Sequence, residues 1–490
     1  MQWQNSGDNM KKKQAEKWRR ALWHPWQDNP GRSHALALWQ HGEIETAHCL
    51  YHTPSVENIV RVVGGRRLYV LCGDILDKNE FPQSNDLLLD PRTTPYTCET
   101  GSVVALRCKH EKANGYFIPS YVWGNRGLPN YELIQLIESL YEITGYEALT
   151  PGSLSEKVLK STLPESLWIR RPDDSTRKFL LEYHRGGRID EAGKAARYPM
   201  VFEYDKNKAY LSYSLSVPSP FVSPVVFVGN NTWQNMPAVF MEVTMTVHGY
   251  GLHPIQVKDN GIMREPVPGE TFTDWLWNDE VIDCVEKGYT LDAVHRGFAW
   301  PVMSNFMEAW ANQLWDWNEK YHHPMFKQMM VTVPGRFLRK PYNWTLVPRY
   351  EAVDGDIEVI PDWSKELQPV EWCLHKEPNL QSAALTPIGS WIVKCGRRAL
   401  YKAMREQLLR DGRVLRSYID CFDMPHPTKT PEMIGVGLGM WKEKRIDNCI
   451  VKGNQIIPVD KQEEAKMPGL ELNSVFRQKH IEQAISDTSF

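Results

Sequence analysis

The sequence predicts a protein of the α+β class that contains both helices and strands. The chain has 490 residues, enough for roughly two to four domains with a large core. Hydrophobic residues make up 42% of the chain and charged residues 24%, a balance typical of folded globular proteins. Short apolar and aromatic runs such as 200–204 predict strands, and the apolar periodicity of 130–144 predicts a helix.

Composition argues against several other classes of protein. No apolar run approaches the roughly 18 to 20 residues of a membrane span, and residues 1–20 lack the apolar middle of a signal peptide. We therefore expect a cytoplasmic protein with no membrane partner. The nine cysteines are spread singly, without a Cys-x-x-Cys pair, which argues against a disulfide framework or a zinc ribbon. A net charge of −3 argues against a uniformly basic nucleic-acid coat, although it says little about a local cleft.

The first third of the chain holds a basic arm and a mixed domain. In residues 1–33 the basic run 11–20 precedes Trp23 and Trp26, a composition that can bind phosphates and stack on bases; a solvated helix docked through its tryptophans is the alternative. We expect strands at 35–38, 68–71 and 103–106 and a helix at 130–144.

Acidic residues in this domain could bind a metal ion. Glu43 and Glu45 are two residues apart and would lie on the same side of a strand. Asp74 is the candidate for a further ligand.

The functional interpretation depends most on residues 200–214. Apolar and aromatic residues at 200–204 predict a short buried strand, and Asp205 stands at its end. A carboxylate at a strand end can point into a cleft, but an acid there is also typical of a turn or cap. Tyr210 follows five residues later.

Adjacent glycines precede this strand. Gly186 and Gly187 would let the backbone approach another backbone closely, and Arg185 and Arg188 would suit phosphates. An ordinary Gly-Gly turn is the alternative.

The middle of the chain predicts a helix at 280–288, a strand at 289–300 and a long helix from about 304. That helix continues into 326–337, where Pro334 breaks it. Lys320 and Lys327 would lie on one face of it, and either lysine alone is typical of a solvated surface.

A basic helix is expected at 391–410, capped by Ser390 and ended by Gly412. Between Lys394 and Arg416 there are eight Lys or Arg against two acids. A solvated helix face is the usual meaning, and a helix behind a sheet that attracts nucleic-acid phosphates is the alternative.

The run 414–424 then predicts strands carrying Tyr418, Asp420 and Asp423. Residues three apart on a flat strand face opposite sides. Asp420 and Asp423 could therefore serve one site only if a turn or bulge intervenes.

In this order the segments resemble the motifs of family B DNA polymerases, most closely those of the protein-primed branch of phages and linear plasmids. Asp205 and Tyr210 match the first palm motif, Asp-x-x-Ser-Leu-Tyr-Pro-Ser. Lys327 matches the second motif, Lys-x-x-x-Asn-Ser-x-Tyr-Gly, although Val331 and Pro334 replace its Asn and Tyr. Tyr418 and the acids after it resemble the third, Tyr-x-Asp-Thr-Asp. The run 436–443 resembles the stretch that follows, and the glycine pair resembles the linker before the palm.

The resemblance implies a right-hand polymerase with palm, fingers and small thumb, preceded by an RNase H-like exonuclease-related α/β domain that is reduced or inactive. The implied domains are the arm at 1–33, the exonuclease-like domain at 34–180, linker and palm at 181–260, an insertion or palm region at 261–303, fingers at 304–340, palm at 341–440 and a thumb-like region at 441–490.

The resemblance also implies site residues, a cofactor and partners. Asp205 and Asp423, with Asp420 as the alternative, would hold two Mg²⁺ ions or Mn²⁺ in their place, and the Lys206 carbonyl would add a ligand. Nucleotide-binding roles fall to Tyr210, Lys327 and Lys320; DNA-binding roles to Gly186, Gly187, Arg188, Lys442 and Lys452; and the exonuclease remnant to Glu43, Glu45 and Asp74. The partners would be a DNA primer-template, dNTPs and, if priming is protein-based, a terminal protein.

The implied function is template-directed DNA synthesis in the replication of a phage or mobile element. A catalytically degenerate polymerase-like protein that binds DNA or a partner is the main alternative, because the second and third motifs carry substitutions. A primase or reverse transcriptase with a similar palm is a further alternative.

Overall fold

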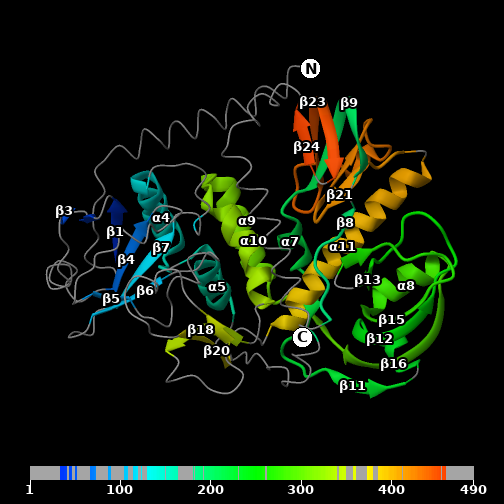
Figure 1. Cartoon of the computed structure of the whole chain (residues 1–490), viewed down its shortest axis with the longest axis horizontal. Coiled ribbons are helices and arrows are strands. Elements are labelled where there is room, and N and C mark those ends of the chain that lie inside the picture. The colour runs from blue at the N-terminus through cyan, green and yellow to red at the C-terminus, as the bar shows by residue number, and fades with distance from the viewer. Residues whose placement is uncertain are drawn as a thin grey trace. The chain divides into compact units, whose positions relative to one another are not determined.

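The chain forms two compact units, seen here in a computed structural model (Figure 1). Unit 1 comprises Met1–Thr162, Asp316–Val333 and Pro341–Leu380, and unit 2 comprises Leu163–Trp315, Pro334–Lys340 and Gln381–Phe490. The structure describes residues 34–40, 43–46, 50–51, 67–72, 87–89, 104–108, 114–119, 123, 130–148, 150–163, 180, 183–190, 192–229, 231–259, 262–338, 342–348, 357–359, 372–378, 385–410, 412–453 and 455–458.

Unit 1 contains a seven-stranded mixed sheet of order β3-β2-β1-β4-β7-β6-β5. Its strands are β1 (His34–Gln40), β2 (Glu43–Thr46), β3 (Leu50–Tyr51), β4 (Arg67–Cys72), β5 (Leu87–Leu89), β6 (Val104–Cys108) and β7 (Asn114–Pro119). β4 runs parallel to both β1 and β7, whereas the outer pairs are antiparallel. Helix α4 (Asn130–Thr144) lies against β1 and β4, and α5 (Pro151–Ser161) follows it. The helix expected at 130–144 and the three expected strands are thus confirmed.

Unit 2 is organised around a six-stranded antiparallel sheet of order β24-β23-β9-β22-β21-β8. Its strands are β8 (Ile189–Asp190), β9 (Ala192–Lys206), β21 (Arg416–Tyr418), β22 (Cys421–Met424), β23 (Trp441–Gly453) and β24 (Gln455–Pro458). Helices α7 (Ala209–Tyr213) and α11 (Thr386–Leu409) belong to the same unit, and α11 contacts both α7 and β22.

The two faces of β9 follow from the alternation of its side chains. Phe202 and Tyr204 point to one face, where they pack with Phe422 and with Leu400 and Met404 of α11. The Tyr204 and Phe422 rings stack at 5.1 Å between centroids. Residues 203 and 205 belong to the other face, so the same alternation that builds the core sends the Asp205 carboxylate away from it.

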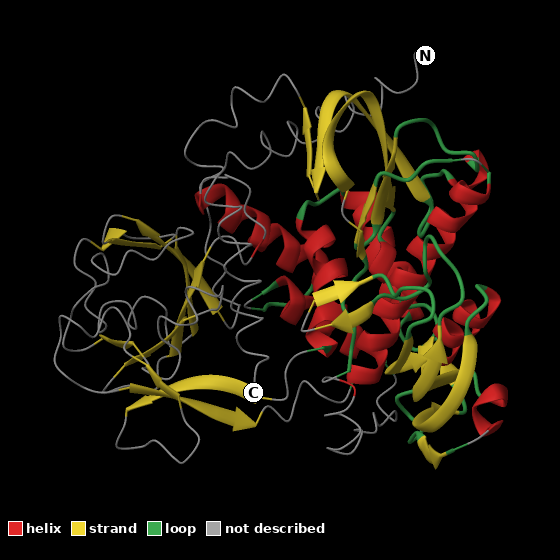
Figure 2. Cartoon of the chain, turned by 45° about the vertical axis from the view of Figure 1, so that its right-hand side comes forward, coloured by secondary structure: helices red, strands yellow, loops and turns green. Residues whose placement is uncertain are grey.

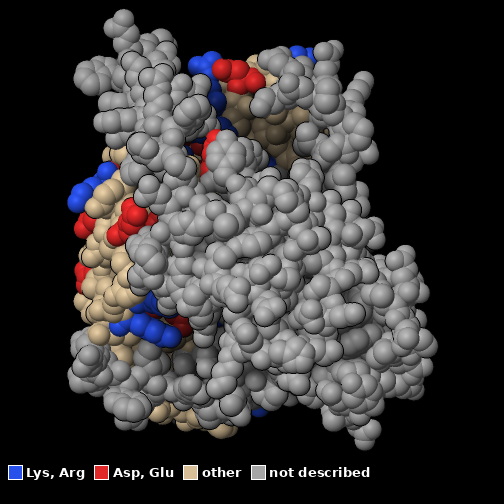
Figure 3. All heavy atoms as spheres, turned by 90° about the vertical axis from the view of Figure 1, so that its left-hand side faces the viewer, with Lys and Arg blue, Asp and Glu red and all other residues tan. Residues whose placement is uncertain are grey.

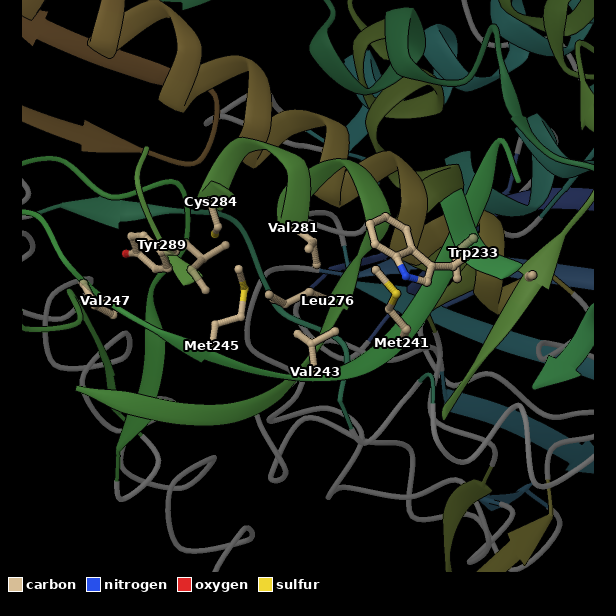
Figure 4. Packing of buried hydrophobic residues seen from close by; sticks show 12 residues of the cluster. Trp233, Met241, Val243, Met245, Val247, Leu276, Val281, Cys284 and Tyr289 are labelled. Atoms are coloured by element: carbon tan, nitrogen blue, oxygen red, sulfur yellow. The ribbon is translucent and has the colours of Figure 1, made fainter. Parts of the chain in front are cut away.

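A second sheet of unit 2 has the order β11-β16-β12-β15 and is covered by one helix (Figure 4). Its strands are β11 (Val225–Val228), β12 (Ala238–Thr246), β15 (Thr271–Trp277) and β16 (Thr290–Trp300), and the helix is α8 (Asn278–Glu286). Met245 and Leu276 are fully buried beneath Val281 of α8. Complete burial of such a side chain contributes roughly 1.5 to 3 kcal/mol, more than the roughly 0 to 1 kcal/mol of an exposed ion pair. Apolar packing therefore fixes α8 on this sheet.

Short elements complete the described part of the chain (Figure 2). In unit 2 these are the pairs β10 (Val217–Pro218) with β17 (Met303–Ser304) and β13 (Val257–Asp259) with β14 (Ile262–Arg264), and the 3₁₀ turns η4 (Asn231–Asn235) and η7 (Pro431–Met433). Unit 1 adds a three-stranded sheet of β18 (Tyr342–Pro348), β20 (Trp372–Pro378) and β19 (Ile357–Val359). Residues 341–440, expected to form one part of a palm, are therefore divided between the two units.

The long helix expected from 304 through 337 is two helices. α9 spans Glu308–Tyr321 and α10 spans Met325–Phe337, with His322 in a left-handed conformation between them (φ 51°). Lys320 and Lys327 therefore do not share one continuous helix face. Pro334 does not end α10, because buried Val333 and Phe337 continue the packing on both sides of it.

α11 begins earlier than expected, at Thr386. Pro387 occupies its first turn, where the missing N–H of proline costs no helical hydrogen bond. Ser390 is a buried residue within the helix and not its cap, and it accepts a hydrogen bond from Trp277 Nε1 at 3.3 Å. Among the described residues, no helix combines the length and apolarity needed to cross a bilayer.

Candidate functional site

Strand β9 carries Asp205 to the end of the central sheet. Asp205 is exposed and stands one residue before the end of β9, which is followed by a turn at Asn207 and Lys208. It is in register with Cys421 of β22 on one side and with Lys442 of β23 on the other. Strands on both sides therefore determine where this carboxylate lies.

The hairpin β21–β22 brings Asp420 to the same end of the sheet. The pairing of these strands leaves only Ile419 and Asp420 in the turn. The Lys206 N–H donates to the Asp420 carbonyl oxygen at 3.1 Å. Because Cys421 is the partner of Asp205, the two acids stand at the ends of adjacent strands. The expected hairpin is confirmed, as is the meeting of these two distant segments in one sheet.

Asp423, three residues further on, has a different environment. Its side chain is 1% exposed, and it lies in register between Arg416 of β21 and Glu203 of β9. Arg416 Nε donates to the Asp423 carboxylate. Burial raises the pKa of Asp423 to about 6, and the Arg416 charge opposes that rise. These contacts are those of an internal ion pair, and the predicted role of Asp423 as a metal ligand finds no support in them.

Tyr210 on α7 belongs to the same end of the sheet as Asp420. Burial raises the pKa of Tyr210 to about 12, the Asp420 charge adds to the rise, and the Arg397 charge opposes it. The phenol is therefore neutral at neutral pH. Since such electrostatic effects act over short distances, Tyr210 lies near both charged groups.

Lys206 extends from β9 on the side opposite to Asp205. Its Nζ lies 5.1 Å from the centroid of the Tyr213 ring and 5.3 Å from that of Trp441, and burial lowers its pKa. The side chain is thus held between aromatic rings, and the predicted ligand role of its carbonyl stays a prediction.

The arginines of the glycine-containing linker, residues 183–188, bind other residues of the protein. Arg188 is 2% exposed, and its guanidinium donates to Asp190, to Glu265 and to the His253 carbonyl oxygen. Arg185 donates to Asp274 of β15. The expected contact of Arg188 with DNA phosphates is therefore corrected: a buried guanidinium bound to two carboxylates is not available to a phosphate.

The basic run of α11 is neutralised by the acids of α8. Ion pairs join the two helices: Lys394 with Asp279, Arg397 with Glu280, Arg398 with both Asp279 and Asp283, Lys402 with Asp283, and Arg405 with Glu286. Lys394, Arg397 and Arg398 are mostly buried and paired with acids, so they form neither a solvated face nor a phosphate-binding face, whereas Lys402 is half exposed. In Figure 3, the Lys and Arg atoms drawn in blue lie close to Asp and Glu atoms drawn in red.

Four further lysines predicted to bind substrates are exposed. Lys442 and Lys452 lie at opposite ends of β23, and only Lys442 is beside Asp205. Lys320 lies on α9 and Lys327 on α10. Gly186 is also exposed.

The metal-binding role of the acids in the expected exonuclease remnant stays a prediction. Glu43 and Glu45 are on strand β2, and Asp74 lies outside the described residues. Within the described part of the chain, no group of three His, Cys, Asp or Glu side chains is placed to hold a metal ion. The acids at the end of the central sheet are thus a pair and not a larger cluster.

Two residues that sequence reasoning missed shape the site. Asn207 is buried, and its Nδ2 donates to the carbonyl oxygens of Val436 at 2.6 Å and Gly437 at 3.0 Å, which ties the loop before β23 to the turn after Asp205. Ile419 adopts a left-handed conformation (φ 59°) directly before Asp420. An Asn after a strand is a turn signal that could have been used, whereas an Ile gives no such signal.

Comparison with known proteins gives a result at the level of structure. No protein-family model and no curated protein matches the sequence. Phi29 DNA polymerase complexed with primer-template DNA is similar over 86% of this chain and 85% of that chain, with a TM-score of 0.61 and 13% identity. The same polymerase complexed with primer-template DNA and incoming nucleotide substrates is similar over 83% and 80%, with a TM-score of 0.59 and 15% identity. This chain therefore shares its fold with those structures.

Proposed function

We propose that this chain is a template-directed DNA polymerase of family B, related to the protein-primed branch, that adds dNTPs to a primer 3′-hydroxyl during replication of a phage or mobile element. One observation carries the proposal. Asp205 and Asp420 stand at the ends of adjacent strands in a fold similar to that of a DNA polymerase. The order of the sequence motifs along the chain supports the same assignment.

The donor chemistry of this pair suits Mg²⁺, with Mn²⁺ as a substitute. Mg²⁺ prefers oxygen ligands and is commonly bound by one or two carboxylates together with substrate phosphates. Asp205 and Asp420 supply two carboxylates, and the triphosphate of the nucleotide would supply further oxygens. When bound, two such ions lower the pKa of the primer hydroxyl and neutralise charge on the triphosphate.

Other residues would bind and orient the substrates. Tyr210, whose phenol stays neutral, would stack under the sugar of the incoming nucleotide. Lys442, beside Asp205, would attract a phosphate to the end of the sheet. Lys327, with Lys320, would bind the triphosphate as point cations on flexible stems. A terminal protein remains the predicted partner if priming is protein-based.

Primer extension tests this proposal directly. A labelled primer-template is incubated with the full chain, Mg²⁺ and the four dNTPs, and DNA binding is measured in parallel. Asp205→Asn should reduce extension by at least about 100-fold, since even partners of metal ligands cost about 10- to 100-fold when removed. DNA binding should remain. Asp292→Asn, an exposed acid on β16, is the matched control and should extend at the parental rate.

Two outcomes would contradict the proposal. Extension by Asp205→Asn at the parental rate would rule out its metal role. A parental chain that binds primer-template but never extends it would favour a polymerase-like DNA-binding protein without synthesis. Extension on an RNA template would indicate a reverse transcriptase, and synthesis without a primer would indicate a primase.

A further inference from the structure

The linker of residues 183–188 is attached on one side to the sheet that carries α8. The Tyr183 ring stacks on Trp275 of β15, with 5.7 Å between centroids and 29° between planes. Arg185 donates to Asp274, the residue before Trp275, and to the Gln256 carbonyl oxygen. The first half of the linker is thus fixed to β15.

The second half of the linker is attached to the turn that carries Asp420. The Ile419 N–H donates to the Arg188 carbonyl oxygen at 2.7 Å. A Cβ added at Gly187 would lie 3.0 Å from Ile419 Cγ2, 3.2 Å from Cγ1 and 3.3 Å from Cα. Real Cβ atoms rarely approach other atoms so closely. An alanine at position 187 would therefore require the linker and the turn to move apart by a few tenths of an ångström.

The turn itself is strained. Ile419 has φ 59°, and a β-branched residue in the left-handed region is a strained outlier. Such a conformation persists only where the surroundings hold it in place. Gly187 and the Arg188 carbonyl group contact Ile419 directly, and the Lys206 N–H binds the carbonyl group of the next residue, Asp420.

Arg397 of α11 clamps the linker between these two attachments. Its Nη1 donates to the carbonyl oxygens of Arg185 at 2.5 Å and Gly186 at 2.9 Å. Its Nε and Nη2 donate to Glu280 of α8 at 3.2 and 2.7 Å. One guanidinium therefore joins α8, α11 and the linker backbone.

We propose that residues 183–188 are a bracket that positions the Asp420 carboxylate: Arg397 fixes the linker backbone, and Gly187 presses on Ile419 to hold the strained turn. Gly187 and Arg397 are positioning residues, since they act on the metal through Asp420. This inference rests on the proposed function, because it assigns Asp420 to the metal pair. It also gives Gly187 a role inside the protein that needs no contact with DNA.

Reciprocal substitutions at the contact test the bracket. Gly187→Ala adds a methyl group against Ile419, and Ile419→Ala removes the atoms at 3.0 and 3.2 Å and relieves strain. Each single variant should displace Asp420. The double variant should restore its place, because the new methyl group fills the space left by the isoleucine and the remaining approach to Cα needs a shift of only tenths of an ångström.

The first readout is the affinity for Mn²⁺, measured by calorimetry on the full chain without DNA. Asp205→Asn is the reference variant in which the proposed metal site is lost. The second is single-nucleotide extension. Each single variant should weaken Mn²⁺ affinity and lower kcat by about 10- to 100-fold, the range for partners of metal ligands. The KM for dNTP should stay within about twofold. The double variant should recover most of both losses. Gly249→Ala, where the nearest atoms are 3.9 Å away, is the control and should behave as the parent.

Failure of the bracket is distinguishable from failure of the proposed function. If the parent binds Mn²⁺ and extends primers but both single variants match it, the bracket is refuted and the polymerase assignment stands. A folded double variant that is no better than Gly187→Ala also refutes the bracket. A parent that neither binds Mn²⁺ nor extends a primer refutes the metal pair on which the bracket depends. Because Ile419→Ala relieves strain, it provides a test even if Gly187→Ala fails to fold.

Discussion

Asp420 and Asp423 are three residues apart in one hairpin, yet they occupy opposite kinds of environment. Asp420 lies in the turn, at the end of the sheet where Asp205 is exposed. Asp423 lies inside β22, is 1% exposed and is bound by Arg416. Arg416 binds Oδ2 of Asp423 and the other oxygen, Oδ1, is buried without a hydrogen-bond partner, so desolvation and a fixed cation, and not access to an exchangeable ion, define the site of this carboxylate.

The largest difference between these acids should appear in activity. Asp420→Asn should reduce primer extension by at least about 100-fold, because it removes one of the two proposed metal-binding carboxylates. Its free energy of unfolding should stay within about 0.5 kcal/mol of the parent, since the residue is in a turn at the sheet end. Extension rates and urea unfolding measure the two effects. If Asp420→Asn lost stability as well as activity, Asp420 would be a structural acid like Asp423 and not a metal ligand.

The next difference should appear in stability, through Arg416. Arg416→Gln leaves the buried Asp423 carboxylate without its cation, and because a carboxyl group with a pKa of about 6 can then take up a proton, the cost at pH 7 should be about 1 to 2 kcal/mol. Urea unfolding at pH 7 measures this loss. The double variant Arg416→Gln with Asp423→Asn, which removes both charges, is the control and should recover much of the loss.

The cost of Arg416→Gln should also depend on pH. Burial already raises the pKa of Asp423 from 3.8 to about 6, so the folded protein holds a proton that the unfolded chain has lost, and stability from this group falls as pH rises between those values. Removing Arg416 raises the pKa further. The cost of the substitution should therefore be small near pH 5 and grow above pH 6. An equal cost at both pH values would show that the ion pair is not what the arginine contributes.

Local patterns allowed much of this site to be predicted from sequence. The apolar run before Asp205 predicted the strand, and the position of the third motif predicted a hairpin, because alternation and turn signals act over a few residues. The choice between Asp420 and Asp423 could not be predicted in this way. It depends on where the turn closes, and the turn closes at Ile419, a residue type that disfavours the left-handed conformation.

The partners of α11 were beyond local reasoning for another reason. The acid that binds Lys394 is Asp279, 115 positions earlier in the chain, so the basic run alone could not show that its charges are internal. The start of α11 lies before the expected one because Pro387 is compatible with the first turn of a helix, although proline usually marks a helix boundary. Tertiary packing likewise overrides the helix-breaking tendency of Pro334 in α10.

A smaller effect, on DNA affinity, should distinguish the lysines at the two ends of β23. Lys442→Gln should weaken binding of primer-template DNA severalfold and reduce the slope of log affinity against log salt by about 1, as expected for loss of one phosphate contact. Lys452→Gln, at the far end of the strand, is the matched variant and should leave the slope unchanged if the DNA meets the sheet beside Asp205. Equal slopes for both variants would move the DNA contact away from this end of the sheet.

The smallest effect should come from the most exposed of the ion pairs between α8 and α11. Arg405 and Glu286 are 4.0 Å apart with side chains 38% and 55% exposed, whereas Asp283 is 3% exposed and bound by Arg398. Glu286→Gln should change the free energy of unfolding by less than about 0.5 kcal/mol, because water screens both charges. Asp283→Asn removes a buried acid from beside Arg398 and Lys402, so it should cost several times more. Equal losses of stability in urea unfolding would mean that burial does not determine how much each ion pair contributes to the free energy of unfolding. The contrast between Asp420 and Asp423 would then lose its physical basis as well.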